Sequence, residues 1–222
     1  MDCYICGQIA GDSSNDLLAE LFGGAYRRRI PVETQDFVAI SSIGAITVGH
    51  TLVCPVGHLR RLADMSDGVA QEYIKFRTLI LGVIRSEFGE NVHIFEHGSD
   101  ASGRVVPCTV EHAHLHVVPM DTSIRVELPT DLRWLKVNSD PAGIAAMVGD
   151  GEYLYYEAPD GTTHVALPYG VPFQSQLLRR ILCAAIGREA WNWREDPALP
   201  LVSETERRLR EGFERFTRNA VL

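Results

Sequence analysis

The amino-acid sequence predicts an α+β fold, in which an antiparallel sheet packs against one long helix and a mixed α/β extension follows. Three observations support this prediction. They are short apolar segments separated by turn residues, one long stretch with helical periodicity, and a change of character after Met120. The chain has 222 residues, of which 45% are hydrophobic, so it can bury one large core or two small ones.

The strands of the first half are predicted from short apolar segments bounded by turn-forming residues. They cover residues 36–42, 51–56, 91–96 and 111–119. The long helix is predicted over residues 66–88, where apolar side chains recur at steps of three and four. Ser66 and Asp67 are candidate N-caps, and Gly89 is typical of a residue that ends a helix.

The second half is predicted to be an extension with its own strands and helices. The predicted elements are a strand over 152–157, a turn at 159–161, and helices over 174–186 and 203–216. Ser203 followed by Glu206 fits a capping box, which predicts that the last helix begins there. We place the boundary between 121 and 130, and divide the chain into residues 1–122 and 123–222.

Charge and cysteine content exclude several classes of protein. A net charge of −8 argues against a broad surface that binds extended nucleic acid. The first residues resemble no signal peptide and the apolar runs are too short to span a bilayer, so no membrane partner is expected. The five cysteines suggest reduced thiols and a metal clip, not a set of disulfides. We therefore expect a cytoplasmic protein.

Three histidines alternate with apolar residues at 112–118, which predicts that His112, His114 and His116 share one face of a strand. Neighbouring rings on that face would lie roughly 6.5–7 Å apart, so all three cannot easily reach one atom. Two of them could share a metal ion, or each ring could have its own task. A neutral imidazole is a good nucleophile toward phosphorus, which favours a covalent transfer reaction.

At these residues the chain resembles the histidine triad (HIT) superfamily, whose signature alternates histidine with apolar residues. Residues 49–55, followed by His58, also resemble the Gly-His-x-Leu-Val-x-Pro strand of that family. The resemblance covers about residues 3–120 and implies a HIT-like fold. It also implies an enzyme in which His114 attacks a nucleotide α-phosphate and His116 contacts the transferred group. The expected substrate is a nucleotide or a nucleotidylated small molecule, and the expected assembly is a homodimer.

Two positions depart from the family pattern. Cys108 stands where the family often has glutamine, which leaves Thr109 as the candidate phosphate donor. Ser42 stands where the family commonly has an aspartate or asparagine that binds the ribose hydroxyls. We therefore expect Ser42, Thr109 and His116 to contact the substrate.

A zinc site is expected at the start of the chain. Cys3 and Cys6 supply two sulfur ligands, and zinc prefers four nitrogen or sulfur ligands in a tetrahedron. Relatives with this Cys-x-x-Cys pair complete the site with two histidines, which the resemblance places at His50 and His112. Such a closed site has no position for a reacting water, so its role would be structural. The remaining histidines, His58 among them, are expected to have surface or core roles.

The extension resembles, more weakly, the C-terminal segment of CwfJ-type proteins, which are HIT-like factors associated with RNA splicing. This resemblance rests on residues 153–161, His164, residues 172–174 and residues 191–194. Two other functions stay open beside a nucleotide hydrolase or nucleotidyltransferase. One is a non-catalytic RNA- or nucleotide-binding adaptor, and the other is a hydrolase whose triad histidines hold a catalytic metal.

Overall fold

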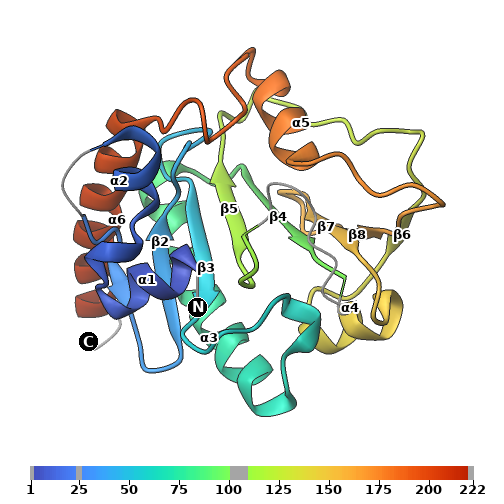
Figure 1. Cartoon of the computed structure of the whole chain (residues 1–222), viewed down its shortest axis with the longest axis horizontal. Coiled ribbons are helices and arrows are strands. Elements are labelled where there is room, and N and C mark those ends of the chain that lie inside the picture. Colours follow the sequence, from blue (N-terminus) through green and yellow to red (C-terminus); the bar gives the residue numbers. More distant parts are fainter. Residues whose placement is uncertain (1–2, 24–26, 101–109, 220–222) are drawn as a thin grey trace.

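A computed structural model describes residues 3–23, 27–100 and 110–219. Its strands form one eight-stranded antiparallel sheet in the order β1-β2-β3-β5-β4-β7-β8-β6 (Figure 1). The strands are β1 (Val32–Glu33), β2 (Phe37–Ser41), β3 (Thr51–Pro55), β4 (Val92–Gly98), β5 (Leu115–Pro119), β6 (Trp134–Lys136), β7 (Tyr153–Glu157) and β8 (Thr163–Ala166). The helices are α1 (Tyr4–Ala10), α2 (Leu17–Phe22), α3 (Asp67–Phe88), α4 (Pro141–Val148), α5 (Leu177–Ala185) and α6 (Leu199–Asn219), with short 3-10 helices at Ser13–Asn15 and Leu62–Asp64.

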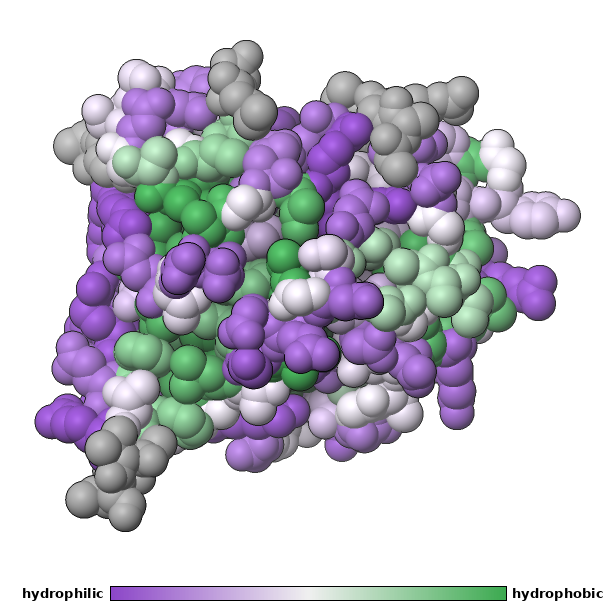
Figure 2. All heavy atoms as spheres, turned by 90° about the horizontal axis from the view of Figure 1, so that it is seen from below, coloured by the Kyte–Doolittle hydropathy of each residue, from purple (hydrophilic) through white to green (hydrophobic). Residues whose placement is uncertain are grey.

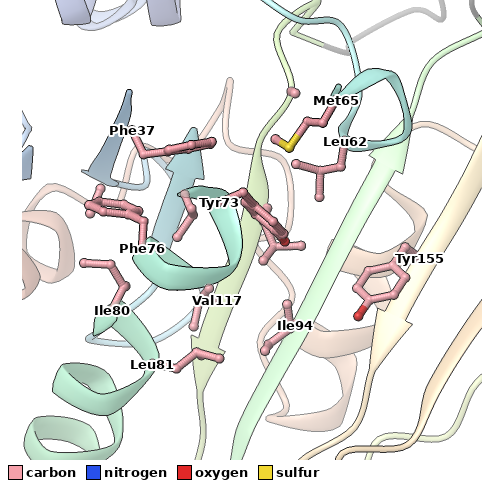
Figure 3. Close-up of a cluster of buried hydrophobic side chains, with 14 of the residues drawn as sticks. Phe37, Leu62, Met65, Tyr73, Phe76, Ile80, Leu81, Ile94, Val117 and Tyr155 are labelled. Carbon is pink, nitrogen blue, oxygen red and sulfur yellow. The ribbon is translucent and has the colours of Figure 1, made fainter. Parts of the chain in front are cut away.

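Helix α3 covers one face of the sheet and carries the main core. It follows Ser66 and ends at Gly89, whose positive φ of 106° suits a glycine, so the expected bounds are confirmed. Side chains of α3 point toward those of the strands, as Tyr73, Phe76 and Ile80 do in Figure 3. Helices α4 and α6 pack beside α3, and residues of both belong to the same cluster.

The opposite face of the sheet is covered by α1 and α5. Residues of α1 pack on β2 and β3, while α5 packs on β4, β7 and β8. The fold is therefore an antiparallel sheet between two helical layers, which confirms the α+β class. The functional residues lie on the α1 and α5 side, because Leu115 and Val117 of β5 face α3 and His116 faces the other way.

The strand that carries the triad is shorter than expected. The sequence predicted a strand over 111–119, whereas β5 begins at Leu115. Extending the register between β3 and β5 would set Ala113 opposite Pro55, which has no N–H to donate. The Ala113 N–H donates instead to the Leu59 carbonyl. His112 and His114 therefore lie in a bend before the strand and face different surroundings.

The last helix begins earlier than its predicted capping box. Helix α6 starts at Leu199, so Ser203 lies in the helix and does not cap it. Pro200 in the first turn explains the earlier start, because proline lacks the N–H that a first turn leaves unbonded. The Ser203 hydroxyl accepts a hydrogen bond from Arg27.

The sheet continues across the expected division at residue 122. Strand β7 of the extension pairs with β4, and both halves supply residues to the main core. The two segments, 1–122 and 123–222, thus share a sheet, and a boundary between independent units stays a prediction. No helix in the described part of the chain is long and apolar enough to cross a membrane. Figure 2, seen from below relative to Figure 1, shows hydrophobic residues among hydrophilic ones in both halves of that face.

Candidate active site

His114, His116 and Ser42 line one pocket on the α1 and α5 side of the sheet. The His116 ring stacks on Phe95 of β4, with ring centroids 4.3 Å apart and an interplanar angle of 10°. The rings of His114 and His116 meet edge to face at 5.0 Å between centroids. The Ser42 hydroxyl donates to the carbonyl of Ile43. Thr109 lies outside the described residues.

The hydrogen bonds of His114 determine its tautomer. Its Nδ1 lies 2.6 Å from the carbonyl oxygen of His112, which can only accept, so Nδ1 carries the proton. The lone pair of the neutral ring is then on Nε2. Burial is the main cause that lowers the pKa of His114, and nearby positive groups lower it further. The ring is therefore neutral near pH 7, which is the form that attacks phosphorus.

His50 lies outside the cluster of residues that could hold a metal and contacts His116 instead. The Ile46 N–H donates to His50 Nδ1, so the neutral His50 ring carries its proton on Nε2. That Nε2 lies 2.9 Å from His116 Nδ1 and donates to it. The proton of His116 is consequently on Nε2. Burial holds the pKa of both rings well below the usual range, so both are neutral.

A separate cluster of Cys3, Cys6, His58 and His112 has the arrangement of a metal site. One ligand atom from each of the four residues lies within 4.8 Å of the other three. Sulfur to Nδ1 distances are 3.3 Å for Cys6 and His58, 3.4 Å for Cys6 and His112, and 3.5 Å for Cys3 and His112. A tetrahedral zinc site has ligand-to-ligand distances of roughly 3.3–3.8 Å, given Zn–S of about 2.3 Å and Zn–N of about 2.0 Å. The four residues therefore fit zinc.

The orientation of His112 also suits a ligand. Its Nε2 donates to the Pro55 carbonyl at 2.9 Å, which leaves the lone pair on Nδ1, facing the two sulfurs. Burial raises the pKa of the Cys6 thiol to about 11, so a bound metal would have to displace its proton.

The prediction of His50 as a metal ligand was therefore wrong, and His58 takes its place. The register explains why: β3 runs antiparallel to β5, with Thr51 opposite Val117. His50 precedes β3 and lies beside His116, whereas His58 follows β3 at the end where His112 lies. The sequence offered a signal, since a histidine three residues after Pro55 is at the correct end of this strand.

Several pocket residues were not predicted as site residues. They are Gln8 of α1, Arg29 before β1, Gln176 and Arg179 at α5, and Trp193 after it. Arg29 is buried as well. Two buried arginines line this pocket, and none of the described residues that line it is acidic. These side chains come from segments that are far apart in the sequence, so no local sequence pattern predicted that they line one pocket.

Comparison with known proteins agrees with the motifs of the sequence. Residues 26–123 match the HIT domain family. Protein hit of Bacillus subtilis is 27% identical over 119 residues, which are 53% of this chain and 70% of the relative. Adenosine 5'-monophosphoramidase hnt1 of Schizosaccharomyces pombe is 25% identical over 119 residues, which are 54% of this chain and 74% of the relative.

One solved structure shares the fold over almost the whole chain. It is a hypothetical histidine triad nucleotide-binding protein from Sulfolobus tokodaii, with a TM-score of 0.51 and 14% identity. The match covers 97% of this chain and 95% of that one, so the extension is part of the shared fold. These relatives do not bear on the resemblance of the extension to CwfJ-type proteins, which stays a prediction.

Proposed function

From the match of residues 26–123 to the HIT domain family, we propose that this chain is a nucleotide hydrolase or nucleotidyltransferase that acts at a nucleotide α-phosphate. The observation that carries the proposal is the His114 ring, which lines the pocket and has its proton fixed on Nδ1. A relative is named as an adenosine 5'-monophosphoramidase, which supports chemistry at the bond between a nucleotide and its leaving group.

The proposed reaction has two displacements at phosphorus. Nε2 of His114 attacks the α-phosphorus, a P–N bond forms, and the bond to the leaving group breaks with its electron pair. Water or another acceptor then attacks the same phosphorus, and the P–N bond breaks to restore the lone pair of Nε2. The acceptor supplies the proton that balances the leaving group. Hydrolysis and transfer differ only in the acceptor.

The proposed role of His116 is to donate a hydrogen bond to a phosphate oxygen. The contact with His50 leaves the His116 proton on Nε2, so the ring offers a fixed donor. Donors that are held in place before the reaction stabilise the charge that develops on the transferred group. Ser42 and Thr109 are proposed to contact the nucleotide as well.

We propose a structural zinc ion at Cys3, Cys6, His58 and His112. Four protein ligands would close its tetrahedron, so zinc would tie α1 to the bend that precedes His114. A hydrolase with a catalytic metal on the triad would need His114 or His116 as a ligand. The metal-dependent hydrolase is disfavoured because the rings of His114 and His116 both lie outside this cluster.

The test is intact-mass analysis of the wild type and His114→Ala after incubation with adenylated and uridylated compounds. Quenching at alkaline pH protects a phosphoramidate. We expect the wild type to gain the mass of one nucleotidyl group, and the variant to gain none and lose turnover by at least about a thousand-fold. Turnover by His114→Ala at the wild-type rate would contradict the proposal, whereas nucleotide binding without turnover by the wild type would favour the adaptor.

A further inference from the structure

The extension places a buried cation in the pocket of the two histidines. Arg179 belongs to α5, has a relative exposure of 4%, and lines the pocket with His114 and His116. Burial lowers the pKa of Arg179 to about 10, which still leaves the guanidinium charged at neutral pH. A buried charge of this kind is costly unless a partner of opposite charge compensates it.

The hydrogen bonds of Arg179 include no carboxylate, and Asp196, which acts on its charge from a longer distance, pairs with Arg188. Nη2 donates to the Gly44 carbonyl at 2.5 Å, and Nε donates to the Trp191 carbonyl at 3.3 Å. Both acceptors are neutral, and no carboxylate of the described residues forms an ion pair with Arg179 within 4.0 Å. A guanidinium has five N–H groups, so most of them are left for another acceptor.

Arg188, in the same segment, is a comparison for Arg179, because it is a partly buried arginine with a carboxylate partner. It also donates to main-chain carbonyls, those of Ala45 and Ile46, but it pairs with the Asp196 carboxylate at 2.7 Å. Arg188 is not among the residues that line the pocket. Arg179 thus differs from Arg188 in both respects: it faces the pocket and lacks a counterion among the described residues.

The position of Arg179 depends on a close approach between the extension and the loop after β2. A Cβ added to Gly44 would lie 2.4 Å from Cβ of Trp193 and 3.0 Å from Nη2 of Arg179. Gly44 also has a φ of +64°, which other residues rarely adopt. The backbone at Gly44 therefore lets the extension bring Arg179 into the pocket.

We propose that Arg179 binds a phosphate oxygen of the substrate, so that the extension supplies a cation to the active site. This inference rests on the proposed function, because it deepens the description of the same pocket. The pocket has no acidic residue among the described residues that line it, although the chain carries a net charge of −8. The ligand class is an anionic nucleotide, whose phosphate provides the missing counterion.

The test compares binding of AMP, adenosine and inorganic pyrophosphate by calorimetry. The variants are Arg179→Met, Arg179→Lys and the control Arg180→Met. Arg180 is the next residue on α5 and stacks on the Trp191 ring at 3.5 Å, outside the pocket. We expect Arg179→Met to weaken AMP and pyrophosphate about ten- to a hundred-fold and to leave adenosine unchanged. The lysine variant should recover part of the loss, and Arg180→Met should bind like the wild type.

An equal loss for AMP and adenosine would show a structural role for Arg179 and overturn the inference, as would unchanged binding of AMP and pyrophosphate. A crystal structure of the wild type with AMP decides the matter even where the variants do not fold. A phosphate oxygen within hydrogen-bonding distance of Arg179 supports the inference, and a phosphate held elsewhere overturns it. Failure of the covalent mechanism alone would appear differently, as normal AMP binding without an adduct on His114.

Discussion

Each histidine of the 112–116 segment has a different set of contacts. His112 has its Nδ1 facing two sulfurs, His114 has its proton fixed by a carbonyl, and His116 accepts a hydrogen bond from His50. Strand geometry predicted that the three rings lie too far apart to act on one atom, so that two of them share a metal ion or each has its own task. It could not predict the role of His50, since the contact with His116 depends on the register between β3 and β5.

The contact between His50 and His116 leads to a prediction for His50→Phe. Without the His50 donor, His116 is free to carry its proton on Nδ1, and its Nε2 then loses the hydrogen that contacts the phosphate. We expect kcat to fall by about ten-fold or more, with steady-state kinetics as the measurement. Zinc content should stay that of the wild type, because His50 lies outside the metal cluster. A variant that lost zinc but kept its kcat would contradict both assignments.

Among the secondary-structure elements, α1 shows most clearly what sequence motifs predict and what they miss. The Cys-x-x-Cys pair predicted a metal site, but the fourth ligand depends on which end of β3 lies beside α1. The first residue of β5 was predicted too early for a similar reason, because Pro55 of the neighbouring strand interrupts the hydrogen-bonded ladder. Helix α4 was not predicted at all. Its Asp140 cap, which accepts from the Gly143 N–H, lies in a short stretch that is rich in small residues.

Removal of the metal should release α1 from the sheet. The His58→Ala variant is expected to hold well under one zinc per chain by elemental analysis, because three ligands bind zinc less tightly than four. Since Tyr4, Ile5 and Gln8 of α1 line the pocket, nucleotide binding should weaken in parallel. The control is His164→Ala, which alters a histidine of β8 outside the cluster. Full zinc occupancy in His58→Ala would refute the assignment of this ligand.

Both halves of the chain contribute strands to one sheet and side chains to one pocket. The N-terminal helices, the strands of the segment that matches the HIT domain family and the C-terminal α5 all contribute to the walls. The sequence motifs predicted the part of the site that lies on one strand, because strand alternation is a local property. They could not predict Gln8, Arg179 or Trp193, whose positions depend on how distant segments pack.

Acid should destabilise the whole molecule through its buried histidines. His93 is 3% exposed, its Nδ1 lies 2.7 Å from the Tyr156 hydroxyl, and burial lowers its pKa to about 4, against roughly 6.5 in the unfolded chain. Between these values the unfolded state binds a proton that the folded state does not, so stability is lost as pH falls through this window. Burial lowers the pKa of His50 and His116 in the same direction.

The corresponding measurement is the free energy of unfolding in urea at pH 7 and pH 5. The wild type should lose stability, and His93→Gln should lose about 1–2 kcal/mol less, because it removes one titrating group while keeping a hydrogen-bond partner for Tyr156. Any effect of metal loss is common to both proteins and cancels in this difference. Equal losses in the two proteins would show that His93 does not titrate as described.

The most direct test of the central claim is to locate the covalent intermediate. Wild-type protein labelled with ¹⁵N at its histidines would be mixed with an adenylated substrate, quenched at alkaline pH, and analysed by peptide mapping and by ³¹P–¹⁵N coupling. We expect a single nucleotidyl group on Nε2 of His114. An adduct on Nδ1, on another histidine or on no residue at all during turnover would contradict it.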